Sequence, residues 1–381
     1  MKKILSVIVV VAVTLFQTVQ ITANAQKSDK PTVNAQACVL YCVDDGKVYF
    51  SVNENKKMKP ASTTKLMTSL ITLEYADSAD KVVAFTKDMT AEGSSMYLKV
   101  GERVKLSDLA AGMMMASGND AANAAAISIA GSAEKFSELM NNRAAVIGMK
   151  NTHFVTPSGL DDENHYSTAY DMALLMSYAL ENESFAKLTS QKSVTVEFSE
   201  PQSKRTTYTN HNRLLSMYEY CTGGKTGYTM AAGRCLVSSA KKDGLTFVCV
   251  TLNDRNDWND HIALYNYGFS KLACIECDDS DYYLEIPCAG GDDESIGVTG
   301  TKGKNVVVPF DKKSNVVRTE YADNFLYAPV KDGDIVGRIE YTLDGKTLAS
   351  TNLTAVEYSN TQNKNKSIWT KIKDFFTYGK E

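Results

Sequence analysis

A serine and a lysine one helical turn apart, Ser62 and Lys65, are the residues whose types and spacing first suggest chemistry. They follow the segment Lys59-Pro60-Ala61 and open an apolar stretch that predicts a helix running to about residue 75. At this spacing both side chains lie on one helix face, so an amine lies beside a hydroxyl near the positive helix N-terminus. That arrangement suits activation of a serine nucleophile, whereas the other Ser-x-x-Lys copies are interpreted as solvated surface pairs.

Two further short motifs follow in order along the chain. Ser117-Gly118-Asn119 lies at a break between predicted helices rich in Ala, Met and Leu, and Lys225-Thr226-Gly227 lies on a predicted strand just after two glycines. Each motif alone is a common accident. Ser-x-x-Lys, Ser-x-Asn and Lys-Thr-Gly in this order form the pattern of penicillin-binding proteins and class A β-lactamases, in which the first serine is the nucleophile.

The hydrophobic pattern indicates the elements that must position these motifs. Alternating apolar runs predict a hairpin over residues 38–52, helices occupy 105–148, and strand patterns return at about 222–252. Beyond about residue 277 the helical pattern stops and short strands follow, with a hairpin turn at Asp344-Gly345. The sequence therefore predicts a mixed α/β domain followed by a separate all-β domain.

The composition excludes other classes of protein. The 381 residues suffice for two or three domains at about 150 residues each. The 41 Lys+Arg and 45 Asp+Glu give a formal net charge of -4, which leaves no basic footprint for nucleic acid. A hydrophobic fraction of 44% with 23% charged residues is that of a soluble globular protein.

The N-terminal residues predict export. A positive Met1-Lys2-Lys3, an apolar run over 4–16 and Ala23-Asn24-Ala25 are typical of a secretory signal peptide cleaved before Gln26. An uncleaved membrane anchor is the alternative, although the apolar run is short for a span of about 20 residues. The mature chain is therefore expected to work outside the cytoplasmic membrane.

The last residues predict membrane attachment. After a polar linker beginning at residue 361, apolar residues recur at helical spacing beside several lysines. Such a helix suits the surface of an anionic membrane, and a helix docked on the β domain is the alternative. The apolar face comprises Ile368, Trp369, Ile372, Phe375 and Phe376.

Taken with the motifs, nearly the whole chain resembles a low-molecular-mass penicillin-binding protein of the serine-type D-alanyl-D-alanine carboxypeptidase family. The wording of residues 60–68, 117–122 and 224–229 is close to that of the family. The resemblance implies an α/β (α+β) β-lactamase/transpeptidase-like domain, a small all-β sandwich-like domain and a C-terminal amphipathic helix. The expected division is signal peptide 1–25, penicillin-binding domain 26–277, β domain 278–360, and linker with membrane-anchor helix 361–381.

The resemblance also implies a role for each motif residue. Ser62 resembles the nucleophile that forms the acyl-enzyme, Lys65 the base that takes its proton, and Ser117 the relay to the leaving D-alanine. The expected substrates are peptidoglycan stem peptides ending in D-Ala-D-Ala, with β-lactams as covalent inhibitors and no cofactor or metal. Backbone N–H groups of Ser62 and Tyr228 would form the oxyanion hole, and the substrate-binding residues would be Asn119, Lys225, Thr226, Gly227 and Tyr228.

One departure and two rival functions stand beside this reading. Some family members carry an arginine in an Asn-Arg-Asn-Gly-Leu-Leu segment that helps bind the substrate carboxylate; here His211 takes its place and Arg213 is displaced by two residues. A class A β-lactamase would need a deacylating glutamate, and the spacing of Glu138 and Asn141 matches, but both lie within a predicted continuous helix. A non-catalytic β-lactam or peptidoglycan sensor would be expected to lack the Ser or Lys.

The eight cysteines allow two interpretations, disulfides in an exported protein or small buried thiols. Cys235 and Cys249 flank a predicted turn at 241–244 almost symmetrically. If they faced each other across a hairpin, their Cβ atoms would be about 4.5–5.5 Å apart, wider than the ~3.8 Å that a disulfide favours. The sequence therefore predicts adjacent but reduced thiols at these two positions.

Overall fold

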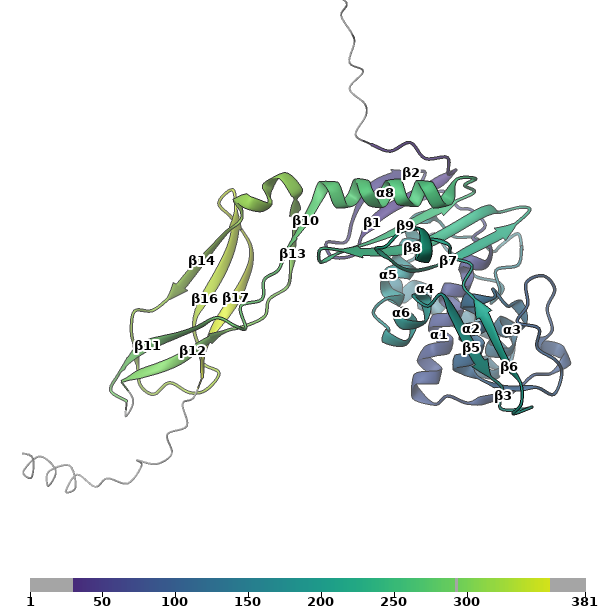
Figure 1. The fold of residues 1–381 in the computed structure, drawn as a ribbon, viewed down its shortest axis with the longest axis horizontal. Coiled ribbons are helices and arrows are strands. Elements are labelled where there is room, and N and C mark those ends of the chain that lie inside the picture. Colours follow the sequence, from purple (N-terminus) through teal and green to yellow (C-terminus); the bar gives the residue numbers. More distant parts are fainter. Residues whose placement is uncertain (1–29, 292–293, 357–381) are drawn as a thin grey trace, which may run out of the picture.

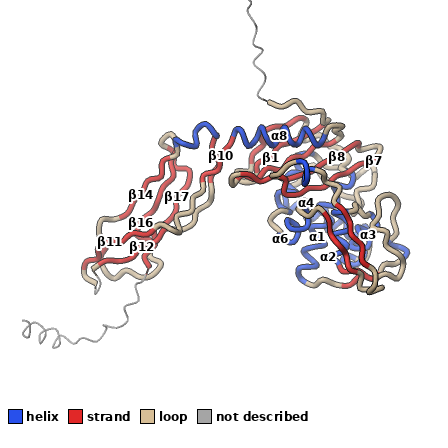
Figure 2. Tube along the Cα trace, viewed as in Figure 1, coloured by secondary structure: helices blue, strands red, loops and turns tan. Residues whose placement is uncertain are grey.

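The structure, a computed structural model, describes residues 30–291 and 294–356 and comprises two domains (Figure 1). The larger domain combines helices with a central sheet, and the smaller one is built of strands (Figure 2). Helix α8 (Asp257–Lys271) leads out of the larger domain into strand β10 (Leu272–Ile275), which starts the connection to the smaller one. The predicted signal peptide and amphipathic C-terminal helix lie outside the described residues.

A five-stranded antiparallel sheet forms the centre of the larger domain, in the order β2-β1-β9-β8-β7. The predicted hairpin at the start of the chain is confirmed as β1 and β2. Strand β7, which carries the Lys-Thr-Gly motif, is an edge strand, so one side of it is open to a ligand. The strands are β1 (Ala37–Cys42), β2 (Lys47–Val52), β7 (Cys221–Thr229), β8 (Gly233–Lys242) and β9 (Leu245–Leu252).

Helices cover both faces of this sheet, which explains why every residue of β1 is buried. Val39 packs into the core shared with α1 and α5, whereas its neighbour Leu40 packs into the core beneath α8. This alternation follows from the two-residue period of a strand. The remaining helices are α1 (Lys65–Ser78), α2 (Leu106–Met115), α3 (Asn119–Ala130), α4 (Ala133–Ile147), α5 (Ala169–Ala179), α6 (Glu183–Thr189) and α7 (Leu214–Met217).

Short elements complete the larger domain. Strands β3 (Val82–Ala84) and β4 (Arg103–Lys105) pair with each other, as do β5 (Ser193–Glu197) and β6 (Arg205–Thr209). Two 3₁₀ turns, η1 and η2, precede α1 and β4 respectively. They comprise Ala61–Thr64 and Lys87–Met89.

The register of the β8–β9 hairpin corrects the prediction for two of the thiols. Both Asp243 and Gly244 have positive φ, 48° and 80°, as a two-residue type I′ turn requires. Cys235 therefore pairs with Leu252, and Cys249 pairs with a serine three positions further along β8. An odd displacement turns the side chains to opposite faces of the sheet, so the two thiols are not adjacent. All eight cysteines are free thiols.

The all-β domain predicted beyond residue 277 is confirmed. A six-stranded sheet in the order β14-β16-β17-β12-β11-β15 packs against a ribbon of β10 and β13 around one apolar core. Asp344 and Gly345 form the predicted tight turn between β16 and β17, with positive φ at both. The strands are β11 (Tyr283–Ala289), β12 (Ser295–Gly300), β13 (Val306–Pro309), β14 (Val317–Ala322), β15 (Leu326–Tyr327), β16 (Ile335–Leu343) and β17 (Lys346–Val356), and a 3₁₀ turn, η3, comprises Phe310–Asn315.

Candidate active site

Ser62 lies in the 3₁₀ turn that precedes α1, rather than inside the helix as its spacing to Lys65 predicted. Ala61 has a φ of 50°, which turns the chain sharply before the serine. Gly227 of β7 packs against this turn, where an added Cβ would lie 3.0 Å from the backbone nitrogen of Ser62. The close approach of β7 to the turn explains the glycine in Lys-Thr-Gly and places the edge strand beside the serine.

Lys65 begins α1 and is fully buried. Its amine donates to Ser62 Oγ at 3.0 Å, Asn119 Oδ1 at 2.7 Å and the carbonyl of Ser158 at 2.6 Å. Burial, reinforced by the positive charge of Lys225, holds the pKa of the Lys65 amine well below its usual range. A neutral amine at hydrogen-bond distance from a hydroxyl can take the proton of that hydroxyl.

The Ser-x-Asn motif lies at the predicted break between two helices, α2 and α3. Ser117 has a φ of 58°, and its hydroxyl accepts a hydrogen bond from Lys225 at 3.1 Å. Asn119 is buried: its amide nitrogen donates to the carbonyl of Glu92 at 2.6 Å while its oxygen accepts from Lys65. In this structure Asn119 therefore bridges the loop at Glu92 and the amine of Lys65, and its expected contact with the substrate amide stays a prediction.

Lys225 of the Lys-Thr-Gly motif is 1% exposed. Its amine donates to Ser117 Oγ and to the carbonyl of Thr226 at 2.8 Å. Burial lowers the pKa of Lys225 to about 7. Two lysines with depressed pKa values thus each donate a hydrogen bond to one of the two serines, Lys65 to Ser62 and Lys225 to Ser117. Such an arrangement is typical of sites that transfer protons.

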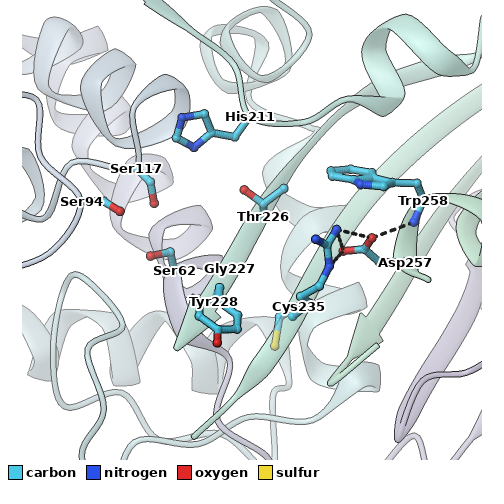
Figure 3. Close-up of a pocket in the computed structure, with 11 residues that line it drawn as sticks. Ser62, Ser94, Ser117, His211, Thr226, Gly227, Tyr228, Cys235, Asp257 and Trp258 are labelled. Carbon is cyan, nitrogen blue, oxygen red and sulfur yellow. Dashed lines mark hydrogen bonds and ion pairs between the residues drawn. The ribbon is translucent and has the colours of Figure 1, made fainter. Parts of the chain in front are cut away.

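A cleft of about 530 Å³ opens above these groups. The structure brings Ser62, Ser117, Thr226, Gly227 and Tyr228 to its wall and buries the remaining predicted site residues beneath it. Figure 3 shows Ser62 and Ser117 on one side of Thr226, and Asp257 and Trp258 on the other. The lining comprises Ser62, Ser94, Ser117, His211, Thr226, Gly227, Tyr228, Arg234, Cys235, Asp257 and Trp258.

The sequence reasoning missed the far wall of the cleft, formed by Arg234, Asp257 and Trp258. The sequence did contain a signal for Arg234. This residue directly follows a glycine at the start of the strand that pairs with Lys-Thr-Gly, so its position beside the motif could have been predicted. Asp257 and Trp258 open α8, and no local motif links that helix to the serine. Only the packing of α8 on the sheet brings these two residues to the cleft.

His165 ties a second loop to the catalytic turn. Its Nδ1 accepts hydrogen bonds from the backbone nitrogens of Val155 and Thr156, so the proton lies on Nε2, which contacts Thr64 Oγ1 at 2.9 Å. Burial lowers the pKa of His165 to about 4, so the ring is neutral. This loop also supplies the carbonyl of Ser158 that accepts from the catalytic lysine candidate, so His165 has a structural role.

The β-lactamase alternative lacks its base at the cleft. Glu138 is exposed on α4 and does not line the cleft, as predicted for a helix face. Asn141 is hydrogen-bonded in both directions to the backbone of Phe154. Within residues 30–291 and 294–356, no group of His, Cys, Asp and Glu side chains is arranged to hold a metal ion.

Comparisons with known proteins agree with this geometry. A family model described as D-alanyl-D-alanine carboxypeptidase matches residues 23–256, and one described as the C-terminal domain of penicillin-binding protein 5 matches residues 278–359. D-alanyl-D-alanine carboxypeptidase DacF of Bacillus subtilis (strain 168) is 32% identical over 372 residues, with 94% of each chain covered. D-alanyl-D-alanine carboxypeptidase DacC of Escherichia coli (strain K12) is 33% identical over 359 residues, which is 88% of this chain and 86% of the relative.

A solved structure extends the match to three dimensions. Penicillin-binding protein 5 from Haemophilus influenzae superposes with a TM-score of 0.64 and 29% identity, covering 86% of this chain and 98% of that one. The similarity therefore includes both domains, as the sequence resemblance implied. The chain belongs to the D-alanyl-D-alanine carboxypeptidase family.

Proposed function

We propose that this protein removes the terminal D-alanine from peptidoglycan stem peptides ending in D-Ala-D-Ala, through an acyl-enzyme on Ser62. The observation that carries the assignment is the buried amine of Lys65, which lies 3.0 Å from Ser62 Oγ and has its pKa held well below the usual range. A lysine in that state is a base rather than a charge. The serine beside it lines the cleft, where a peptide carbonyl can reach it.

In the acylation step, Ser62 Oγ attacks the carbonyl carbon of the penultimate D-alanine while its proton passes to Lys65 Nζ. The backbone N–H groups of Ser62 and Tyr228 stabilise the oxyanion of the tetrahedral intermediate. The C–N bond then breaks, and a proton passes from Lys65 through the hydroxyl of Ser117 to the leaving nitrogen. Free D-alanine departs and an ester on Ser62 remains.

Substrate recognition is assigned to the edge strand and its neighbours. Lys225 and Thr226 bind the terminal carboxylate, and Asn119 binds the peptide amide. Gly227 and Tyr228 continue the same strand, whose open edge can pair with an extended peptide. The charge of Lys225 attracts the carboxylate, which in turn favours the protonated form of the amine.

Deacylation returns the enzyme to its starting state. Water attacks the ester carbonyl, its proton passes to Lys65, and Ser62 regains its hydroxyl. A β-lactam would acylate Ser62 by ring opening, so its leaving group would stay tethered. Because no glutamate base lines the cleft among the described residues, we expect that adduct to last for minutes or longer.

A direct assay tests this function. The mature protein is incubated with a muropeptide ending in D-Ala-D-Ala, and free D-alanine is measured by mass spectrometry. In parallel, intact mass after incubation with penicillin reports a covalent adduct and its lifetime. Release of D-alanine with a long-lived adduct supports the carboxypeptidase. Rapid penicillin hydrolysis supports the β-lactamase alternative. The absence of both activities supports a sensor.

Location follows the same proposal. The mature chain is placed outside the cytoplasmic membrane, with domains at 26–277 and 278–360 and peripheral attachment through the segment 361–381. Within the part of the chain that the structure describes, no helix is long and apolar enough to cross a bilayer. Liposome co-sedimentation of full-length protein and a variant lacking residues 365–381 tests the attachment, and equal sedimentation contradicts it.

A further inference from the structure

The far wall of the cleft carries an arginine that the proposed mechanism leaves unused. Of the described residues that line it, Arg234 alone carries a guanidinium. Asp257 and Trp258, its neighbours on α8, lie across Thr226 from the two serines (Figure 3). A substrate that reaches from Ser62 past Thr226 therefore ends near this wall, and the end of a D-Ala-D-Ala peptide is a carboxylate.

The strand register brings Arg234 beside Thr226. Arg234 on β8 pairs directly with Tyr228 on β7, and Thr226 pairs with Leu236. Arg234 and Thr226 are thus diagonal neighbours with side chains on the same face of the sheet. Diagonal neighbours of this kind have Cα atoms about 7–8 Å apart. An arginine side chain spans that separation, so its guanidinium and the Thr226 hydroxyl can bind one carboxylate between them.

The guanidinium is held in a fixed orientation by α8. Its Nε donates to Asp257 at 3.1 Å and its Nη2 donates to both carboxylate oxygens at 2.6 and 2.8 Å. It also lies over the ring of Trp258, with Cζ 5.7 Å from the centroid. Asp257 is buried, whereas the arginine side chain is 44% exposed and lines the cleft. The amino group Nη1 takes no part in the pair, so donors remain for an anion.

Lys225 is already assigned to this carboxylate in the proposed function, and two further cationic candidates are less suitable than Arg234. His211 occupies the position where some relatives carry arginine, and it lines the cleft. Loss of solvent around its ring and the charge of Lys225 lower the pKa of His211, which disfavours its protonated form. Arg213 precedes α7 and is exposed, and it does not line the cleft.

We propose that Arg234 binds the α-carboxylate of the terminal D-alanine together with Thr226, and that Asp257 positions its guanidinium for this contact. Arg234 carries its charge at any physiological pH, whereas the protonated form of His211 is disfavoured. The inference rests on the proposed function, since it adds to Lys225 and Thr226 a further residue that selects substrates with a free C-terminal carboxylate.

The experiment compares two peptides, one ending in D-Ala-D-Ala with a free carboxylate and the same peptide as its C-terminal amide. Product release from each is measured by mass spectrometry for the wild type, Arg234→Gln, and Arg213→Gln as the matched control. We expect Arg234→Gln to lower the ratio of kcat/KM for acid over amide about 10- to 100-fold, the loss typical of a hydrogen bond to a charged group. Arg213→Gln is expected to leave the ratio unchanged.

Two further variants keep the test decisive. Arg234→Lys retains the positive charge but lacks the planar guanidinium, so it should keep part of the acid-over-amide ratio of kcat/KM. It also provides a test if Arg234→Gln does not fold. His211→Gln tests the rival position. Equal losses on acid and amide in Arg234→Gln, or a lowered ratio in His211→Gln alone, overturn the proposal.

A binding measurement separates this inference from the proposed function. In the Ser62→Ala background, calorimetry compares the affinity for the acid and the amide without turnover. Preference for the acid that disappears in Arg234→Gln supports the proposal even if wild-type protein releases no D-alanine, a result that would contradict the proposed function alone. Unchanged preference in Arg234→Gln contradicts the inference whatever the enzyme activity.

Discussion

Lys65 in the catalytic domain and Asp279 in the small domain are both buried, but their surroundings differ. Asp279 accepts hydrogen bonds from Arg318 at 2.8 Å, from Tyr341 at 3.0 Å and from Thr351 at 2.5 Å. The carboxylate thus has a cation and two hydroxyls. Lys65 contacts a hydroxyl, an amide oxygen and a carbonyl. Burial lowers its pKa, and the charge of Lys225 lowers it further, against a smaller opposing effect of Asp120.

These two groups show how each domain accommodates the free-energy cost of burying an ionisable side chain. A buried charge that is paired and fully hydrogen-bonded can hold strands together, as Asp279 does for β14, β16 and β17. A buried amine without a carboxylate partner gives up its proton instead. The catalytic domain therefore keeps a reactive base at the expense of stability, and the small domain keeps a satisfied ion pair that performs no chemistry.

The largest expected effect tests the reactive side of this comparison. Ser62→Ala removes the nucleophile while keeping both lysines buried, so D-alanine release should fall by about 10⁴-fold or more. Covalent labelling by a fluorescent penicillin should disappear, while the circular dichroism spectrum stays that of the wild type. Labelling retained in this variant would place the nucleophile on another residue.

Lys65→Met asks whether the buried lysine is reactive or merely structural. Loss of a general base should lower kcat/KM by about 10²- to 10⁴-fold, with the nucleophile still present. The methionine fills a similar volume, so we expect a folded protein by near-UV circular dichroism. Activity within a few-fold of the wild type would show that Lys65 resembles Asp279 after all.

The matching change in the small domain should act on stability alone. Asp279→Ala leaves the hydroxyls of Tyr341 and Thr351 and the guanidinium of Arg318 without their acceptor, at a cost of about 2–3 kcal/mol. This cost already allows for solvent screening of the Arg318 ion pair, because the arginine side chain is 38% exposed. Scanning calorimetry should show a lower unfolding temperature of the small domain. The turnover of soluble peptides should be unchanged. A loss of turnover in folded protein would mean that the two domains are coupled.

Local patterns were sufficient to predict what depends on short segments. The three motifs, the tight turn at Asp344-Gly345 and the change from helix to strand near residue 277 are all encoded within a few residues. The turn at Asp243-Gly244 was visible as well, but placing its centre one or two residues early displaced the register of Cys235 and Cys249. A strand register is this sensitive because side chains alternate faces at every residue.

Features that depend on distant segments could not be predicted. The backbone of Ser117 adopts a positive φ, and Asn119 turns inward to Glu92 in the loop between η2 and β4, which is distant in the sequence. The pair of Arg234 and Asp257 likewise forms only once α8 has packed on the sheet. Such contacts reflect tertiary packing, which overrides local preference.

The smallest expected effect is a pH dependence of stability that belongs to Lys225. Burial lowers the pKa of its amine to about 7 in the folded protein, against the ordinary 10.5 in the unfolded chain. Between these two values the unfolded chain binds more protons, so the free energy of unfolding rises with pH; below about pH 7 both states are protonated and the contribution is constant.

The measurement isolates this residue by comparing the wild type with Lys225→Met, in denaturant titrations at pH 6, 7, 8 and 9. Methionine does not titrate, so an offset from lost packing is the same at every pH, and the slope of the difference reports the Lys225 amine together with the effect of its charge on the pKa values of Lys65 and His211. We expect the stability of the wild type relative to the variant to rise by about 1–3 kcal/mol from pH 7 to 9. Lys241→Met, at an exposed position of β8, is the matched control and should give a flat difference. A flat difference for Lys225→Met too would mean that the amine keeps its proton in the folded state, with water or an ion reaching it, and the contrast with Asp279 would then be one of partners and not of charge.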